Sequence, residues 1–431
     1  MLTYTYKAKL NAHAHRNLAE FLTQQRLLYN GALQERIDCY QKTGESISLF
    51  DQRGSLTTIR HSDEWFRKFD RWCQDSALVR VDRAFKRFFR EGRGFPRFKS
   101  AKRGVMSFET LYKKPTFSGK YGSVKIKGLG RFRWRQDDRC NDRDTVKLLR
   151  VVKRPTGVFV QLVCDVEIQR LSLNRAIGID VGVHVNAALS DGTVIPRHTP
   201  DRAEIRRKQR ALSRCKPGSK RRQKRRQALA RACYRVRVRR HNAIHRLTND
   251  IVKDHGKWIV VEALDIEAMT ASAKGTAECP GHQVKPKTGL NRSILDQNWG
   301  TFISQLDYKA ASAGGQLVRV DPKYTTQRCS NCGGLPVKSL TLKDRWYHCT
   351  YCGYGDDRDV NASKNVLLKG LALFDAGGAI PAVSATENGI RTWVLIDTEP
   401  CNECENHTEV HMRLNSIESR EVAFSQTKST K

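Results

Sequence analysis

The sequence has no apolar run as long as the roughly 18 residues that a membrane-spanning helix needs. Its first residues, MLTYTYKAKL, also lack the apolar core of a secretory signal peptide. These absences predict an intracellular protein, in which the thirteen cysteines stay mostly reduced. A CxxC pair in such a protein more often holds a metal ion than a disulfide.

Acidic residues are scarce as well. The chain carries 44 Asp and Glu against 78 Lys and Arg, a formal net charge of +34 over 431 residues. Self-repulsion of this size destabilises a compact state unless a polyanion neutralises it, so we expect nucleic acid, rather than an acidic membrane surface, as the partner. The length suffices for about three domains.

The first 170 residues predict a small β-barrel interrupted by a helical insertion at about residues 12–100. Period-two alternation indicates strands and an apolar stripe at helical spacing indicates helices. The strand-like segments are residues 4–10, 122–134 and 145–167, and the helical segments are residues 18–40 and 76–90.

Two segments concentrate positive charge. Residues 92–104, GRGFPRFKSAKRG, mix basic residues with Phe95 and Phe98, a composition suited to phosphate contact beside base stacking. Residues 202–240 hold eighteen Lys or Arg against the single acid Glu204, broken by KPGS. A basic run alone is often only a solvated helix face. Here we expect two helices along a nucleic-acid backbone, the second continuing to Gly256.

Residues 171–370 alternate strands and helices, as a mixed α/β sheet would. Residues 175–195 predict a hairpin with its turn at residues 190–192. Residues 270–290 are rich in Gly, Pro, Thr and Lys and predict a mobile loop, whose Cys279 and His282 lack partners for a metal site. One helix is expected from Asn291 to the glycines at 314 and 315.

Three acids stand out in this region. Asp180 lies in the apolar run 176–181, and Glu262 ends the apolar, strand-like opening of residues 257–269. Asp359 lies near the start of a helical pattern at residues 356–370, where one carboxylate alone is often only a cap. Because a buried, unpartnered carboxylate is costly, Asp180 needs a cation or a hydrogen-bond network, and we favour the cation.

Acids from three separate elements suggest a divalent-metal site. Two like charges about 4 Å apart repel by roughly 4 kcal/mol at an effective dielectric near 20, so the three acids could converge only around cations. Oxygen ligands favour Mg²⁺ or Mn²⁺, and two such ions hydrolyse a phosphodiester in line. Neighbouring acids compete for two of the three positions: Asp265 and Glu267 with Glu262, and Asp356 and Asp357 with Asp359.

Four cysteines form the most specific short motif of the chain. Cys329, Cys332, Cys349 and Cys352 give C-x2-C-x16-C-x2-C, with a glycine directly after each pair. This spacing predicts a zinc ribbon, and four thiolates leave no open coordination position, so one structural Zn²⁺ is expected. Zinc binding would supply folding free energy to this short segment, and we expect the folded segment to fix the geometry of the helix that carries Asp359.

The chain from about residue 371 predicts an acidic, disordered tail. It contains a second set of ligand types, Cys401, Cys404, His407 and His411, whose spacing is too short for a finger with an apolar core between the pairs. We therefore favour the tail over a metal site.

At these motifs the sequence resembles TnpB, the insertion-sequence protein related to the compact type V CRISPR effectors. The similar segments are GIDVG, VVEAL, NRSILDQNWG, YTTQRCSNCG and DRDVNASKN, together with YNGALQERIDCY, SISLFDQ, VDRAFKRFF and GFPRFKS in the N-terminal half. The resemblance covers about residues 1–370. Tyr354 and Ser363 depart from it without removing a metal ligand.

The resemblance implies a multidomain α/β protein. Residues 1–170 would form a wedge β-barrel with a helical recognition insert, and residues 171–327 and 354–370 a RuvC-like RNase H fold with a basic helical insert at 202–256. Residues 328–353 would be the inserted zinc ribbon, followed by the tail, residues 371–431. Asp180, Glu262 and Asp359 would be the catalytic, magnesium-binding triad.

The implied activity is cleavage of double-stranded DNA, directed by a guide RNA encoded at the transposon end and licensed by a short adjacent motif that the protein reads. Base pairing would then read sequence while a basic channel holds the heteroduplex. The protein would be a monomer within the ribonucleoprotein, in the prokaryotic cytoplasm and on the nucleoid when bound to DNA. Two alternatives are a catalytically inactive RNA-guided DNA-binding repressor and a zinc-ribbon DNA-binding transposase accessory protein. No Tyr-nucleophile HUH motif supports transposition chemistry itself.

Overall fold

The protein is described from a computed structural model. It covers residues 2–101, 104–111, 113–137, 142–166, 170–197, 201–276, 279–336, 339–341, 344–375, 381–385 and 391–395. The chain forms two compact units. The first unit contains Met1–Ile168 and Asp201–Val238, and the second contains Gln169–Pro200 and Arg239–Lys431.

The first unit contains a seven-stranded antiparallel sheet in the order β2-β6-β7-β1-β5-β4-β3. Alternate residues of its strands enter one core, in which Phe132 and Trp134 are fully buried. The strands are β1 (Leu2–Lys9), β2 (Ser107–Thr110), β3 (Thr116–Ser118), β4 (Tyr121–Ile126), β5 (Gly130–Arg135), β6 (Val146–Arg154) and β7 (Gly157–Cys164). The predicted strand segments are confirmed.

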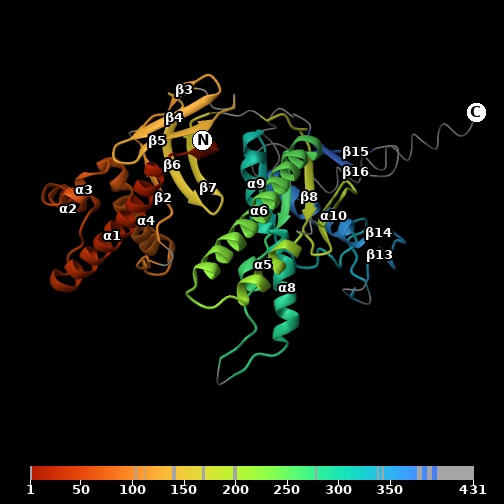
Figure 1. The fold of residues 1–431 in the computed structure, drawn as a ribbon. Coiled ribbons are helices and arrows are strands. Elements are labelled where there is room, and N and C mark those ends of the chain that lie inside the picture. The colour runs from red at the N-terminus through yellow and green to blue at the C-terminus, as the bar shows by residue number, and fades with distance from the viewer. Residues whose placement is uncertain are drawn as a thin grey trace, which may run out of the picture. The chain divides into compact units, whose positions relative to one another are not determined.

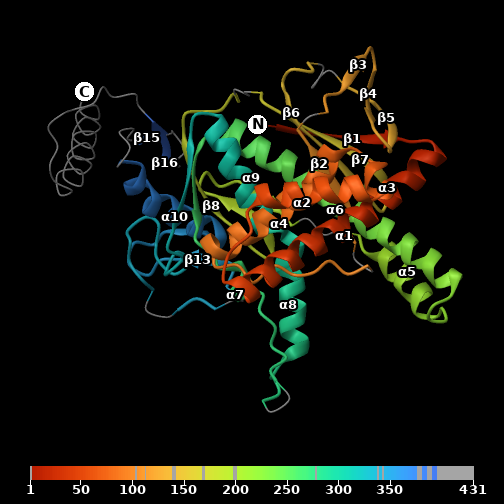
Figure 2. The same ribbon diagram turned by 90° about the vertical axis from the view of Figure 1, so that its left-hand side faces the viewer.

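Four helices are inserted between β1 and β2, as the sequence predicts. They are α1 (Ala12–Thr43), α2 (Leu49–Ser62), α3 (Glu64–Arg67) and α4 (Arg71–Glu91). Side-chain caps fix all four starts: Asn11 accepts from the Ala14 amide, Ser48 forms a capping box with Asp51, Asp63 accepts from the Trp65 amide, and Asp70 accepts from the Trp72 amide. Helices α1, α2 and α4 pack together around a small apolar core (Figure 2).

The basic region forms two helices, α5 (Ala203–Ser213) and α6 (Lys220–Asp250), separated at the Pro-Gly break as expected. Glu204 of α5 pairs with Arg235 of α6 at 2.7 Å. The Arg154 guanidinium of β6 donates to the Tyr234 hydroxyl at 2.7 Å. The part of α6 up to Val238 is therefore bound to the sheet of the first unit, and its remainder belongs to the second unit.

The second unit contains a five-stranded sheet in the order β10-β9-β8-β11-β12. The strands β8, β11 and β12 are parallel, and β9 and β10 are antiparallel to their neighbours. The elements of this sheet and its helices are β8 (Ala176–Asp180), β9 (Val185–Leu189), β10 (Val194–Pro196), the π-helical turn η1 (Ile251–His255), β11 (Trp258–Glu262), α7 (Ile266–Met269), α8 (Val284–Gln297), α9 (Trp299–Ser312) and β12 (Gln316–Val320).

Helices cover both faces of this sheet. Ile177, Ile179 and Val261 belong to one core, with Trp299 and Phe302 of α9. Val260 belongs to the opposite core, with Val366 and Leu367 of α10 (Arg358–Asp375), which lies beside β8 (Figure 1). The sheet is therefore the middle of three layers. The remaining strands are β13 (Trp346–His348) and β14 (Gly355–Asp357), which pair with each other, and a second pair, β15 (Pro381–Ala385) and β16 (Arg391–Leu395).

Three local expectations need correction. The single helix expected from Asn291 is two helices, because Asn298 takes a left-handed conformation (φ 58°) between α8 and α9. The expected loop 270–290 ends early, since α8 begins at Val284. The turn at residues 190–192 joins β9 to β10. The hairpin with this turn is therefore formed by β9 and β10, and β8, the first strand of the region, is not one of its two strands.

Among the described residues, no helix combines the length and apolar content needed to cross a bilayer. Most of the predicted acidic tail, including Cys401, Cys404, His407 and His411, lies outside the described residues.

Candidate catalytic and metal-binding sites

Asp180 and Glu262 are the last residues of two neighbouring parallel strands, β8 and β11. The strands are in register, with Val261 opposite Ile179, so both acids reach the same edge of the sheet. Side chains alternate between the faces of a strand. Asp180 and Glu262 therefore share the face of Val260, which is the face that α10 covers.

Asp359 lies in the first turn of α10 and reaches this edge because α10 packs unusually close to β8. The contact is at Gly178, where a Cβ atom would lie only 2.2 Å from the Ser363 carbonyl oxygen. Ser363 is one turn beyond Asp359 on the helix, and Gly178 is two residues before Asp180 on the strand. The close packing thus brings the start of α10 to the end of β8.

Electrostatic interactions connect Asp180 to each of the other two acids. Burial, followed by the charges of Glu262 and Asp359, raises the pKa of Asp180 to about 8. Burial also raises the pKa of Glu262, against a hydrogen bond from Thr325 that lowers it. Carboxyl groups with raised pKa values favour an added positive charge, because a cation restores their ionised form.

The neighbouring acids have other roles. Asp357 caps α10 by accepting from the amides of Asp359 and Val360, at 2.8 and 3.2 Å. Asp356 accepts from the Tyr354 hydroxyl and from Lys364. Asp265 caps α7 and Glu267 is exposed. Asp359 has only a long ion pair, 3.7 Å, with Arg345 among the interactions described. These contacts distinguish Asp359 from Asp356 and Asp357, and Glu262 from Asp265 and Glu267.

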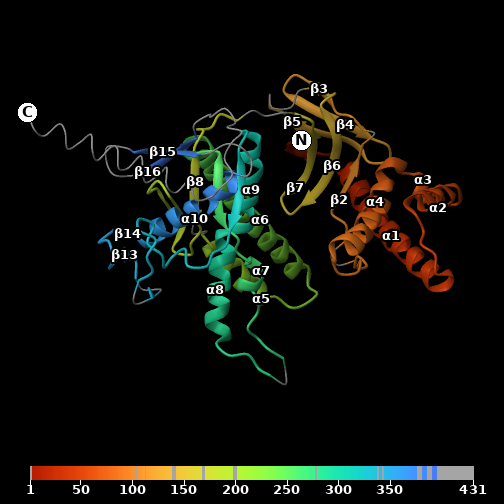
Figure 3. The same ribbon diagram turned by 180° about the vertical axis from the view of Figure 1, so that it is seen from behind.

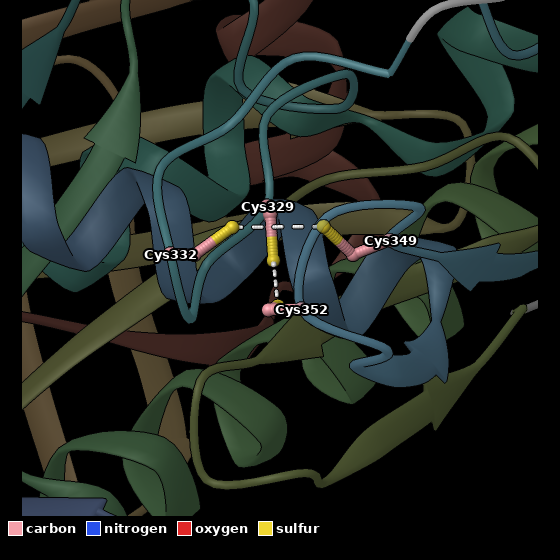
Figure 4. Close-up of side chains that lie close together, drawn as sticks. All are labelled: Cys329, Cys332, Cys349 and Cys352. Carbon is pink, nitrogen blue, oxygen red and sulfur yellow. Dashed lines mark hydrogen bonds between the residues drawn. The ribbon is translucent and has the colours of Figure 1, made fainter.

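The four cysteines converge more tightly than the acids do (Figure 4). Within the described part of the chain, they are the one group of three or more Cys, His, Asp or Glu side chains whose ligand atoms all lie within 4.8 Å of one another. The Sγ atoms of Cys329 and Cys352 are 3.8 Å apart, and those of Cys332 and Cys349 are 3.6 Å apart. The carboxylates of the three acids are more widely spread, and their like charges repel one another.

Two matching backbone turns hold the cysteines. Gly333 and Gly353 adopt left-handed conformations (φ 76° and 71°), and their amides donate to the carbonyls of Cys329 and Cys349. Backbone hydrogen bonding at Cys352 lowers the pKa of Cys349 to about 6, whereas burial raises the pKa of Cys329 to about 12. The second turn is followed by β14 and α10, which lie next to each other (Figure 3), and the Ser330 amide of the first turn donates to Asn361 of α10, so the cluster is beside the helix that carries Asp359.

The first unit exposes aromatic side chains among cations. Phe85, Phe88, Phe89 and Phe95 form one cluster with ring centroids 5.0–6.2 Å apart. Phe89 is 75% exposed. The side chains of Lys86 and Arg93 are exposed as well. A stacking surface with cations around it is suited to nucleic acid.

Several polar residues that connect these sites were not predicted from the sequence. Thr325 donates a hydrogen bond to Glu262, and Asn361 and Asn365 of α10 bind backbone groups beside Cys329. The available signal was the presence of two amides within an otherwise apolar helical pattern.

Known proteins are similar in sequence to most of this chain. A protein of Escherichia coli K12 named as RNA-guided DNA endonuclease InsQ is 31% identical over 362 residues, which cover 82% of this chain and 88% of that protein. The chain belongs to the TnpB family. A family member from Streptomyces pristinaespiralis, also named as an RNA-guided DNA endonuclease, is 30% identical over 366 residues, or 82% of this chain and 86% of that protein.

Two family models match parts of this TnpB-family chain. The model described as "Probable transposase" matches residues 161–273, and the "Cas12f1-like, TNB domain" model matches residues 299–366, which include all four cysteines and Asp359. A solved structure of the Cas12f1-sgRNA-target DNA complex contains a similar fold, with a TM-score of 0.54 and 15% identity over 81% of this chain and 82% of that one.

Proposed function

We propose that this TnpB-family protein is an RNA-guided endonuclease that hydrolyses target DNA at a centre formed by Asp180, Glu262 and Asp359. One observation carries the assignment: Asp180 and Glu262 end two neighbouring parallel strands beside the helix of Asp359, and burial together with the charges of Glu262 and Asp359 raises the pKa of Asp180 to about 8. Such a group is costly to retain unless it binds a cation.

The donor set fits Mg²⁺ or Mn²⁺, because all three side chains offer carboxylate oxygens. Two bound ions would supply an activated water and stabilise the leaving oxygen in phosphodiester hydrolysis. The residues of the chain hold the ligands. Asp180 is the last residue of β8, and the Thr325 hydroxyl holds Glu262 by a hydrogen bond. Close packing at Gly178 sets the position of Asp359.

We further propose that the four cysteines hold one Zn²⁺. A tetrahedral site with Zn–S bonds of about 2.3 Å places its sulfurs about 3.8 Å apart, close to the distances found here. The surrounding core is small, with Cys329, Tyr347 and Cys349 as its buried members. The metal would therefore supply much of the folding free energy of this segment. With four protein ligands, its role would be structural.

The partners that fit this chain are a guide RNA and double-stranded target DNA. The basic helices α5 and α6 would neutralise phosphates, and the aromatic cluster around Phe89 would stack on unpaired bases. The solved complex of Cas12f1 contains both an sgRNA and target DNA. Reading of a short motif next to the target would fall to the first unit, whose helices present exposed side chains.

The domain assignment follows the same proposal. Residues 1–170 would be the wedge domain with its recognition insert at about 12–100. Residues 171–327 and 354–370 would be the RuvC-like nuclease domain with the basic insert 202–256, and residues 328–353 the zinc ribbon. The strand order of the second sheet, three antiparallel strands continued by two parallel ones, supports an RNase H-like core.

A purified ribonucleoprotein tests the proposal. The RNA that co-purifies with the full chain should be sequenced, and plasmids that carry a matching target next to a randomised flank should be incubated with it and Mg²⁺. The proposal predicts cleavage next to one short motif. Bound RNA and sequence-directed DNA binding without cleavage would favour the inactive repressor. DNA binding without any co-purifying RNA would favour the transposase accessory protein.

A further inference from the structure

Residues 321–328, here called the connecting segment, join β12 to the first cysteine turn. The polar side chains of α10 bind its backbone carbonyls at several points. Lys369 donates to Asp321 and Lys323, Asn365 donates to Thr325 (2.8 Å) and Arg328 (2.6 Å), and Asn361 donates to Arg328 (2.8 Å).

The three α10 residues share one face of the helix, because they are spaced four residues apart. Asn361 is 0% exposed and Asn365 is 2% exposed. A buried amide is costly unless it is hydrogen-bonded, so these two side chains fix the connecting segment firmly against α10. The Asn361 Oδ1 atom also accepts from the Ser330 amide at 3.0 Å, which extends the attachment into the first cysteine turn.

The backbone of the connecting segment is strained at Tyr324, which adopts φ 63°. A left-handed conformation in a residue with a bulky side chain costs on the order of 1–3 kcal/mol and persists where the surroundings over-determine it. The carbonyls on either side of Tyr324, those of Lys323 and Thr325, are both bound by α10. The strained residue therefore lies between two carbonyls that α10 binds, and it directly precedes Thr325.

Thr325 connects this attachment to the active centre. Its side chain is buried, at 1% exposed, and its hydroxyl lies 2.5 Å from Oε1 of Glu262. The hydroxyl has one proton, and Oε1 is a nearer acceptor than the Pro322 carbonyl oxygen at 2.9 Å. Hydrogen bonds to a carboxylate are stronger than those to a neutral carbonyl.

We infer that Thr325 is a positioning residue for Glu262, held in place by the α10 side chains that bind the connecting segment. The inference rests on the proposed function of Glu262 as a metal ligand. One carboxylate oxygen is held by the hydroxyl, so the rotation of the carboxyl group is restricted and the other oxygen remains for a metal ion. Residues that orient a metal ligand typically contribute about 10–100-fold in metal affinity.

The test compares Thr325→Val, which keeps the shape and removes the hydroxyl, with Thr325→Ser, which restores it. Thr288→Val is the matched control, because Thr288 is in the same unit, is exposed and donates only within α8. Each full-length protein is titrated with Mn²⁺ by electron paramagnetic resonance. Cleavage is measured against Mg²⁺ concentration, and zinc content and RNA binding are measured as checks on the fold.

Thr325→Val should weaken Mn²⁺ binding by about 10–100-fold and raise the half-saturating Mg²⁺ concentration, with cleavage recovering at high Mg²⁺. Thr325→Ser and Thr288→Val should resemble the wild type. If the wild type binds Mn²⁺ and cleaves DNA and Thr325→Val does both equally well, the inference is overturned and the proposed function stands. Loss of zinc or RNA binding in Thr325→Val would also overturn it, because the role would then be structural. Wild-type protein that neither binds Mn²⁺ nor cleaves would overturn both.

Discussion

Replacing Gly178 with alanine tests how α10 brings Asp359 to the sheet. The new Cβ atom would lie 2.2 Å from the Ser363 carbonyl oxygen and 2.7 Å from the Leu367 amide nitrogen, whereas ordinary contact begins at 3.4 Å. Both neighbours are backbone atoms of α10, so no flexible side chain can move aside. The helix must therefore retreat from β8 by about 1 Å, the shift that ordinary packing distances require.

Two effects of different size follow from this retreat. Overpacking of a well-packed core costs about 1–3 kcal/mol of stability. Misplacing a catalytic group by about 1 Å can cost roughly 100-fold in rate. Gly178→Ala should therefore lower the free energy of unfolding moderately while reducing cleavage far more, because Asp359 moves with the helix.

The assay combines urea unfolding of the full-length protein with single-turnover cleavage by the ribonucleoprotein at saturating Mg²⁺. Gly289→Ala is the control, since Gly289 lies in α8 of the same unit and has no atom within 4 Å of an added Cβ. It should keep full activity and gain up to about 1 kcal/mol in stability. Wild-type cleavage and stability in Gly178→Ala would refute the account of how α10 is positioned.

Three further predictions concern other parts of the molecule. Burial would raise the pKa of Asp191, but hydrogen bonds from His255 and Thr193 outweigh it and lower the pKa to about 2. The resulting stability, about 1–2 kcal/mol after solvent screening, is present above pH about 4 and is lost as the pH falls towards 2. Asp191→Asn should remove it at neutral pH and flatten the acid limb of an unfolding titration, and an unchanged pH profile would contradict this. Cys349→Ser should abolish stoichiometric zinc and give unfolded or insoluble protein, so a soluble, active and zinc-free variant would show that the cluster is dispensable. Raising salt should weaken RNA and DNA binding steeply, with log K falling linearly in log salt, and a flat response would remove the phosphate-contact role of residues 202–240.

The sequence predicted the elements that depend on periodicity and on residue chemistry. The strands ending at Asp180 and Glu262, the helix carrying Asp359 and the cysteine spacing could all be identified, because each has a local signature. The relation of the acids to one another needed tertiary information. Only the structure shows that Asp356 accepts a hydrogen bond from Lys364 and that Asp357 caps α10. These contacts distinguish both acids from Asp359.

Single-residue conformations explain the misses. The apolar stripe continues across Asn298, so periodicity alone could not reveal a break produced by a left-handed residue. The start of α8 at Val284 lies in a segment whose Gly, Pro and Lys content favours a loop. Thr325 has no local pattern at all, since its role depends on a strained neighbour and on carbonyls bound by a helix about 40 residues later in the sequence.

The most direct test of the central claim is the cleavage rate of Asp180→Asn ribonucleoprotein in Mg²⁺, measured beside its affinity for target DNA. Asparagine keeps the size of the side chain and removes the charge that the proposed metal ions require. The account predicts undetectable cleavage with RNA and DNA binding retained. Cleavage at the wild-type rate would contradict the assignment of Asp180, and with it the proposed catalytic centre.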